Sequence, residues 1–295
     1  MQVAVERLER DDVRLADVAR FIADLNRLPE HHIGYLSLEQ AGVLHELREM
    51  VQGSSELLVA TVHGEMVGVL GFDADPEIGR AWLYGPFVAE GEWQRMADEL
   101  WNVLDPLIQE PVREVEVYCN AANTNVIAFA RGLRLAPYKD AVILRIDRDE
   151  ALAQPEPDGV MLVTPEHHQA FVDLHQATFP NTYYTGVQIL DRVAASPDRR
   201  VFAIVEGGEL LGYAHVEALP DLADATIEFV GVSPSARGKG VGTRLLHAAL
   251  HWIFSYPTIN VLSLTTETDN AVALRLYQRA GFRIIHEMRS FRSRI

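Results

Sequence analysis

Cysteine is almost absent from this sequence, since Cys119 is the single one among 295 residues. One cysteine cannot close a disulfide within the chain or build a cysteine-rich zinc site. The sequence also lacks a His-Glu-x-x-His pattern, a cluster of cysteines and histidines, and a carboxylate-rich loop. We therefore predict that the protein binds no metal.

Long apolar runs are missing as well. A membrane-spanning helix needs about 20 mostly apolar residues in a row, and no segment approaches that length. The first residues do not show the basic start and apolar run of a signal peptide. These absences favour a cytoplasmic protein that has no contact with a membrane.

Basic residues are few relative to acidic ones. The 26 Lys and Arg residues face 42 Asp and Glu residues, which gives a net charge of -16. Nucleic acid is not an expected partner, because binding to phosphates needs a basic surface. A cationic small molecule or a peptide amine would instead be attracted. The apolar share of 48% is ordinary for a globular protein with a real core.

What the sequence does contain is a glycine-rich turn between an expected strand and an expected helix. Residues 225–232 are rich in β-branched and aromatic side chains and are followed by a Ser-Pro pair. Gly238, Gly240 and Gly242 come next, and apolar residues then recur at helical spacing. Backbone N–H groups at such a turn can hold a phosphate. A glycine-rich surface turn without a ligand is the alternative.

The pattern of this turn discriminates among phosphate-binding motifs. A Walker A loop would need Gly at Ser233 and Ser or Thr at Gly240, so it fails at two positions. A dinucleotide fingerprint starting at Gly238 would need Gly or Ala at Thr243, so it fails at one. The pattern Arg237-x-x-Gly240-x-Gly242 does fit, and with it the sequence resembles the GNAT acetyltransferase superfamily.

The resemblance implies that acetyl-CoA binds at this turn. In the family, the turn holds the pyrophosphate, and main-chain groups of the preceding strand pair with the pantetheine arm. On this sequence, the resemblance assigns the arm to the main chain near Val230 and Val232. It assigns the pyrophosphate to the run Arg237, Gly238, Lys239, Gly240, Val241, Gly242 and Thr243.

A second stretch matches the family's other signature, an Asn and, two turns later, a Tyr before Gly-Phe. Asn270, Tyr277 and Gly281-Phe282 supply these residues. The resemblance implies that Asn270 hydrogen-bonds the cofactor arm, and Asp269 or Asn270 is also expected to cap the helix. Tyr277 suits the protonation of the departing thiolate, because its pKa is close to that of a thiol. The alternative is a core aromatic residue on an amphipathic helix.

Glu228 is the candidate general base. On a strand, it would share one face with Val230 and Val232. A carboxylate on an otherwise apolar strand is expected to have a raised pKa, as a base that works near neutral pH requires. A structural carboxylate paired with an arginine is the alternative.

The acceptor site is less well defined by the sequence. Tyr183 and Tyr184 lie between two expected helices, where GNAT relatives line the acceptor pocket. Two tyrosines could hold a cation over their rings, or they could be packing residues. His215, on the strand before Glu228, is predicted to be a hydrogen-bonded core residue rather than a ligand.

The chain repeats one plan twice. The hairpin turn His63-Gly64-Glu65 recurs as Gly207-Gly208-Glu209, and Gly132 recurs as Gly281. The prolines and charges of residues 147–158 mark the joint. We predict an α/β protein of two tandem GNAT-like domains, residues 1–150 and 158–295. Each would have a mixed, mostly antiparallel sheet flanked by helices.

The two copies differ at the candidate site. The first has Glu90-Gly91-Glu92 where the second has its glycine-rich turn, and two carboxylates would repel a pyrophosphate. Counted back from the glycine that follows each helix, Ala128 stands in the place of Tyr277. The first copy is therefore predicted to be degenerate, and acetyl-CoA is expected to bind the second copy alone.

Together these features predict an acetyl-CoA-dependent N-acetyltransferase. A primary amine of a small molecule or peptide would attack the thioester directly in a ternary complex. The alternative is a non-catalytic CoA-binding or sensing protein that keeps the fold. The two copies are expected to associate as a dimer within one chain, so that the protein acts as a monomer. The first copy would then wall part of the acceptor cleft of the second.

Overall fold

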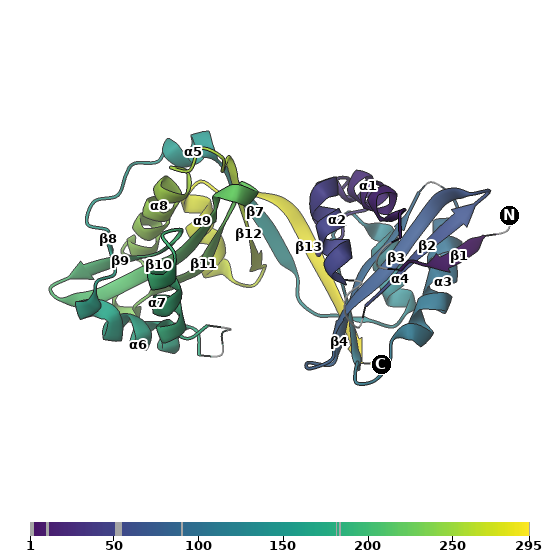
Figure 1. Cartoon of the computed structure of the whole chain (residues 1–295). Helices are drawn as coiled ribbons and strands as arrows, with labels where there is room; N and C mark the ends of the chain where they lie inside the picture. The colour runs from purple at the N-terminus through teal and green to yellow at the C-terminus, as the bar shows by residue number, and fades with distance from the viewer. Residues whose placement is uncertain are drawn as a thin grey trace. The chain divides into compact units, whose positions relative to one another are not determined.

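The structure is a computed structural model that describes residues 3–9, 12–50, 55–89, 91–180, 182 and 184–294, with the backbone alone for residues 293 and 294. The chain forms two compact units (Figure 1), residues 1–142 with 286–295, and residues 143–285. Helices flank β-sheets in both units, so the predicted α/β class is confirmed.

The first unit is built on one mixed sheet. Its elements are β1 (Ala4–Arg7), α1 (Leu15–Asn26), α2 (Gln40–Met50), β2 (Glu56–Val62), β3 (Glu65–Asp75), β4 (Arg80–Val88), α3 (Trp93–Leu104), β5 (Glu114–Asn120), α4 (Thr124–Gly132), β6 (Ala136–Pro137) and most of β13 (Arg283–Arg294). The strand order is β1-β2-β3-β4-β5-β13, and β6 also pairs with β13. Among the described strands of this unit, β4 and β5 pair in parallel and the other pairs are antiparallel.

The second unit contains a sheet of four strands and two further strands outside that sheet. Its elements are most of β7 (Ala141–Asp147), α5 (Arg148–Leu152), β8 (Met161–Leu162), α6 (His168–Thr178), α7 (Gly186–Ala195), β9 (Arg199–Glu206), β10 (Glu209–Leu219), β11 (Asp224–Val232), α8 (Val241–Ile253), β12 (Val261–Glu267) and α9 (Ala271–Arg279). An antiparallel sheet has the order β11-β10-β9-β8, and β12 pairs with β7.

Helices cover both faces of the β8–β11 sheet (Figure 1). Phe171 of α6 packs with Tyr213 and Phe229 on one face. On the other face, Leu245 of α8 packs with Ala214. Tyr213 and Ala214 are neighbours on β10, and successive residues of a strand point to opposite faces. The alternation along one strand therefore builds two separate cores.

The division of the chain differs from the predicted domains, 1–150 and 158–295. Residues 143–158 belong to the second unit and residues 286–295 to the first. Strand pairing is the reason, because Met288 to Arg294 of β13 form an antiparallel ladder with β5. The periodicity of a strand is local, whereas the sheet that it joins depends on residues far along the chain.

The predicted joint at residues 147–158 is not a free linker. It contains α5, and its Arg148 donates hydrogen bonds to three carbonyls just after α8, those of Phe254, Tyr256 and Ile259. Arg244 of α8 donates to the carbonyl of Asp158 at 2.6 Å. The prolines of this segment predict an irregular backbone correctly. Hydrogen bonds from Arg148 and Arg244 nevertheless hold the segment against α8 and the residues that follow it.

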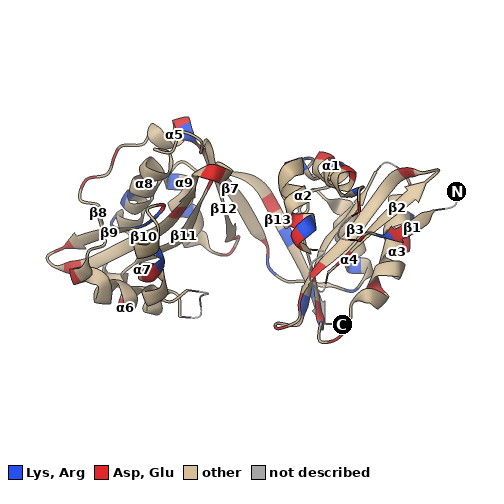
Figure 2. Ribbon diagram, viewed as in Figure 1, with Lys and Arg blue, Asp and Glu red and all other residues tan. Residues whose placement is uncertain are grey.

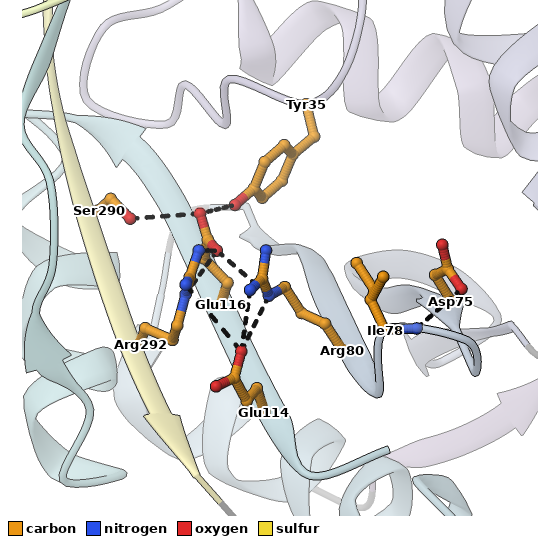
Figure 3. Close-up of polar contacts among 8 residues, drawn as sticks. All are labelled: Tyr35, Asp75, Ile78, Arg80, Glu114, Glu116, Ser290 and Arg292. Atoms are coloured by element: carbon orange, nitrogen blue, oxygen red, sulfur yellow. Dashed lines mark hydrogen bonds and ion pairs between the residues drawn. The ribbon is translucent and has the colours of Figure 1, made fainter. Parts of the chain in front are cut away.

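A buried carboxylate fastens β13 into the first unit (Figure 3). Glu116 of β5 accepts hydrogen bonds from the Tyr35 hydroxyl at 3.1 Å, the Ser290 hydroxyl at 3.3 Å and Arg292 Nε at 2.9 Å. Arg80 lies beside it and pairs with Glu114 at 2.9 Å. Burying a carboxylate is costly unless it is paired and hydrogen-bonded. The network therefore favours one register of β13 against β5.

The charge excess is not confined to one unit. Figure 2 shows Asp and Glu on elements of both units, interspersed with Lys and Arg. In the part of the chain that the structure describes, no helix is long and apolar enough to cross a membrane.

Candidate active site

The strand β11 carries an irregularity at the candidate base. His215 of β10 lies opposite Phe229, but the next residue, Val216, lies opposite Ile227. Glu228 is therefore the extra residue of a β-bulge, and the simple alternation predicted from Glu228 to Val230 is interrupted there. Bulges bend a strand and re-aim a side chain, and they are frequent beside active sites. Glu228 itself is half-buried.

The glycine-rich turn joins β11 to α8 as the sequence predicts. Gly238 and Gly240 have φ angles of 77° and 81°, in the region that only glycine adopts without strain. A Cβ atom at either position would meet no atom within 4 Å outside its chain neighbours, so the space beside the turn is open. Gly240 is the N-cap of α8 and offers no side-chain cap to its first N–H groups. These groups have no acceptor within the helix and can bind an anion.

The two cations of the turn are exposed to solvent. Arg237 and Lys239 both lie on the exposed part of the turn. Arg237 Nε donates to the carbonyl of Val232 at 3.3 Å, which ties the turn to the end of β11. Together with the dipole of α8, these side chains make the turn locally positive in an acidic protein.

Gly242 has a different role from the other two glycines. A Cβ atom there would lie 3.1 Å from a methyl carbon of Leu276 and 3.6 Å from a methyl carbon of Val232. The first turn of α8 therefore lies directly against α9, the helix that carries Tyr277. This contact joins the two sequence signatures, which are separated by about thirty residues of chain.

Asn270 is the N-cap of α9, as expected. Its side-chain oxygen accepts a hydrogen bond from the N–H of Ala273 at 3.1 Å. Asn123 caps α4 of the first unit in the same way, through the N–H of Val126 at 3.1 Å. Because the first copy keeps the cap without the glycine-rich turn, capping alone is enough to explain an asparagine here.

Tyr277 is half-buried on α9. Its ring packs edge-to-face against Phe282, with 5.7 Å between ring centroids. Burial raises the pKa of the Tyr277 hydroxyl above its usual value of 10.0. The hydroxyl therefore stays protonated near neutral pH and can donate its proton.

The capping residues also correct an alignment between the copies. Tyr277 is the seventh residue after Asn270, and the seventh after Asn123 is Ala130, not Ala128. The first copy therefore has a fully buried alanine in the place of the tyrosine. The interpretation that it lacks the acid is unchanged.

The turn of the first copy is also different in structure. Glu92 precedes α3 and pairs with Arg95 at 2.8 Å. Trp93, the first residue of α3, packs edge-to-face against Phe129 of α4, at 6.3 Å between ring centroids. The helix of the first copy thus begins with a bulky, packed ring, whereas α8 of the second unit begins with Val241 after a glycine. Glu90 lies outside the described residues.

Of the two predicted acceptor tyrosines, Tyr184 is described and Tyr183 is not. The guanidinium carbon of Arg192 lies over the Tyr184 ring at 4.4 Å from its centroid. One face of this ring therefore already holds a cation, and that cation belongs to the chain itself.

His215 differs from the prediction of a hydrogen-bonded core residue. It is fully buried, but among the described residues neither of its ring nitrogens has a hydrogen-bond partner. Its ring stacks on that of Phe229, with 6.3 Å between centroids. Burial lowers its pKa to about 4, so the ring is neutral at physiological pH.

Sequence reasoning missed two buried polar residues, His175 of α6 and Tyr213 of β10, which are hydrogen-bonded to each other at 2.6 Å. The available signal was a polar side chain on the apolar face of each element. Their pairing could not be found in one sequence, because they lie far apart along it. No group of three or more His, Cys, Asp or Glu side chains in the described residues could hold a metal ion.

Comparisons with known proteins give the family of this site. Residues 168–282 match the acetyltransferase (GNAT) family. The N-alpha-acetyltransferase RimI of Mycobacterium tuberculosis is 30% identical over 132 residues, which are 44% of this chain and 81% of that protein. The residues that match the family, 168–282, contain both signatures of the second unit.

Two further proteins match almost the whole chain. The mycothiol acetyltransferase of Amycolatopsis mediterranei is 26% identical over 295 residues, and the alignment covers 94% of each chain. The solved structure of a tandem GNAT protein from the clavulanic acid biosynthesis pathway superposes with a TM-score of 0.63 at 17% identity. It covers 99% of this chain and 98% of that one. The predicted tandem fold is thereby confirmed.

Proposed function

Because the chain belongs to the acetyltransferase (GNAT) family, we propose that its second unit transfers an acetyl group from acetyl-CoA to a primary amine. The observation that carries the proposal is the contact between the two signatures. Gly242 in the first turn of α8 lies against Leu276, the residue before Tyr277. The anion-binding end of α8 and the candidate acid therefore belong to one packed unit.

The turn would hold the pyrophosphate of acetyl-CoA. The N–H groups at the start of α8 point out of the helix end, and Arg237 and Lys239 add positive charge. In the described part of the β8–β11 sheet, β11 is the end strand and is paired on one side, to β10. Its other edge could pair with the pantetheine arm near Val230 and Val232, as an added strand does.

Glu228 and Tyr277 would handle the protons of the transfer. As the amine nitrogen bonds to the carbonyl carbon, Glu228 takes the proton that the amine releases, directly or through water. As the carbon–sulfur bond breaks, Tyr277 donates its proton to the departing thiolate. The hydroxyl is protonated near neutral pH, and its raised pKa makes it a weaker acid than a free tyrosine. Asn270 would support the arm with the side-chain amide that does not cap α9.

The names of the relatives support one acceptor class over the other. A mycothiol acetyltransferase matches 94% of this chain, whereas the N-alpha-acetyltransferase matches 44% of it. A likeness along both units favours a small-molecule amine as the acceptor over a peptide amine.

Release of the free thiol of CoA tests this function. Acetyl-CoA is incubated with the full chain and a panel of small-molecule primary amines and peptides with free N-termini. We expect at least one amine to raise thiol release above the rate without amine, and Gly240→Glu to abolish the increase. If calorimetry shows that acetyl-CoA binds but no amine raises thiol release, the protein is a CoA-binding protein and not an acetyltransferase.

A further inference from the structure

A chain of buried contacts links the cofactor strand to the segment between α6 and α7. It begins at Gly231 of β11, which lies opposite Tyr213 of β10. A Cβ atom at Gly231 would overlap the Tyr213 ring, so the ring lies directly on the backbone of β11. Gly231 stands between Val230 and Val232, the two residues proposed to pair with the pantetheine arm.

The same tyrosine then reaches His175. The hydroxyl of Tyr213 and Nδ1 of His175 are 2.6 Å apart, and Nε2 of His175 is 2.9 Å from the carbonyl oxygen of Tyr184. A carbonyl oxygen only accepts, so Nε2 carries the hydrogen. With a hydrogen on Nε2 alone, the ring accepts the hydrogen of Tyr213 at Nδ1. Both side chains are fully buried, and this order of donors satisfies every polar atom in the chain of contacts.

Tyr184 is held to β10 a second time through its ring. Arg192 lies over that ring, and its guanidinium pairs with Glu217 of β10 at 3.2 Å. The backbone and the side chain of Tyr184 are thus fixed independently to the same strand.

We propose that Tyr213 and His175 are positioning residues that fix Tyr184 relative to β11 and thereby set the affinity for the acceptor. The proposal rests on the proposed function, in which β11 carries the thioester arm, and on the sequence prediction that Tyr184 lines the acceptor pocket. A pocket residue that is already held in place lowers the entropy lost when the acceptor binds. A small displacement of such a residue weakens binding and catalysis. Because neither side chain would touch the arm, affinity for acetyl-CoA should be unaffected.

The first test removes only the hydroxyl, in the full chain with Tyr213→Phe. The matched control is Tyr256→Phe, which removes a hydroxyl that donates to Asp198 at 2.9 Å elsewhere in the same unit. Tyr213→Phe is expected to raise the KM for the acceptor about tenfold, the effect of one lost hydrogen bond. The Kd for acetyl-CoA should change less than twofold, and the control should change neither constant.

Substitutions at His175 separate the two hydrogen bonds. His175→Gln can place its amide nitrogen where Nε2 lies but has no acceptor at the position of Nδ1, whereas His175→Leu loses both hydrogen bonds. The KM for the acceptor should therefore rise less in His175→Gln than in His175→Leu. Equal values for both variants and the natural chain, or equal losses of acceptor and acetyl-CoA affinity, would overturn the positioning role.

A measurement without turnover keeps this inference separate from the proposed function. Amide hydrogen exchange of a peptide that contains Tyr184 should be faster in Tyr213→Phe than in Tyr256→Phe. The reason is that His175, which holds the carbonyl of Tyr184, loses its hydrogen bond to Tyr213. Unchanged exchange would refute the tie whatever the activity. Faster exchange in a chain that acetylates no amine would support the tie and refute the acetyltransferase function instead.

Discussion

The hydroxyl of Tyr277 is the residue-scale feature with the most direct chemical consequence. We expect Tyr277→Phe to lower turnover by roughly ten- to a thousandfold, because general-acid catalysis contributes about 10²–10⁴ and solvent can partly replace it. The Kd for acetyl-CoA should remain nearly the same, since the hydroxyl is needed only when the thiolate forms. Steady-state kinetics and calorimetry check the two halves of this prediction. Unchanged turnover from pH 6 to 9 would make Tyr277 a packing residue.

His215 is a residue whose burial has a thermodynamic consequence. Its pKa is about 4 in the folded chain, against 6.5 as its ordinary value. The groups that act on it are Glu217 of the same strand, Arg192, Arg199 and His175. Between pH 6.5 and 4 the unfolded chain binds the proton and the folded chain does not. The stability present above pH 6.5 is therefore lost as the pH falls.

Replacing His215 should remove this pH dependence. At pH 5 the loss relative to pH 7.5 amounts to about 2 kcal/mol from this one group. In His215→Leu, the free energy of unfolding should decrease less between these pH values by that amount. Chemical denaturation of both chains at pH 5 and 7.5 measures the difference. If the two chains lose equal stability, the imidazole is either protonated in the fold or hydrogen-bonded there.

At the scale of elements, the turn before α8 offers a matched pair of substitutions. Gly240→Ala and Gly240→Glu both place a side chain at a φ of 81°, which costs about 1–3 kcal/mol of backbone strain in each. A Cβ atom added at this position would meet no atom within 4 Å outside its chain neighbours. The difference between them therefore reports charge at the proposed pyrophosphate site.

We expect Gly240→Glu to bind acetyl-CoA at least about tenfold more weakly than Gly240→Ala, because a carboxylate would face a phosphate. The difference should shrink in high salt, which screens exposed charges. Calorimetry at low and high ionic strength measures both effects. Equal affinities for the two variants would place the pyrophosphate elsewhere.

The strand, turn and helix around Gly240 could be predicted because each depends on local chemistry. β-branched residues favour the strand, and glycines supply the positive φ angles before α8. The bulge at Glu228 could not be predicted in this way. It is defined by the register against β10, and one sequence does not reveal which residues of two strands lie opposite each other.

Contacts over long distances explain the other differences. Tyr184 was a reasonable candidate for holding a cation, but Arg192 of the next helix covers one face of its ring. His215 was expected to be hydrogen-bonded, because buried polar groups usually are. Whether a partner reaches a buried ring depends on elements that pack from above and below, and strand periodicity contains no information on them.

At the scale of the whole molecule, two strands lie in a different unit from the one that the sequence repeat predicts. Residues 143–147 of β7 belong to the second unit, and residues 286–294 of β13 pair in the first. Ser290 and Arg292 of β13 also hold the buried Glu116 (Figure 3). A cut at the boundary that the repeat suggests would therefore leave both pieces incomplete.

Two fragments test this consequence. Residues 158–295 follow the repeat, whereas residues 143–285 follow the observed unit. The first fragment lacks β7, the partner of β12, and lacks Arg148, which caps the carbonyls after α8. It also carries residues 286–294 without β5, and an unpaired strand is prone to association with other chains.

We expect residues 143–285 to be monodisperse, with a Kd for acetyl-CoA within about fivefold of the full chain, since the turn and α9 are intact. Residues 158–295 should aggregate or unfold at a clearly lower temperature. Size-exclusion chromatography, thermal unfolding and calorimetry of the two fragments make the comparison. If residues 158–295 are as stable and bind acetyl-CoA as tightly as residues 143–285, then β7 and α5 do not stabilise the second unit.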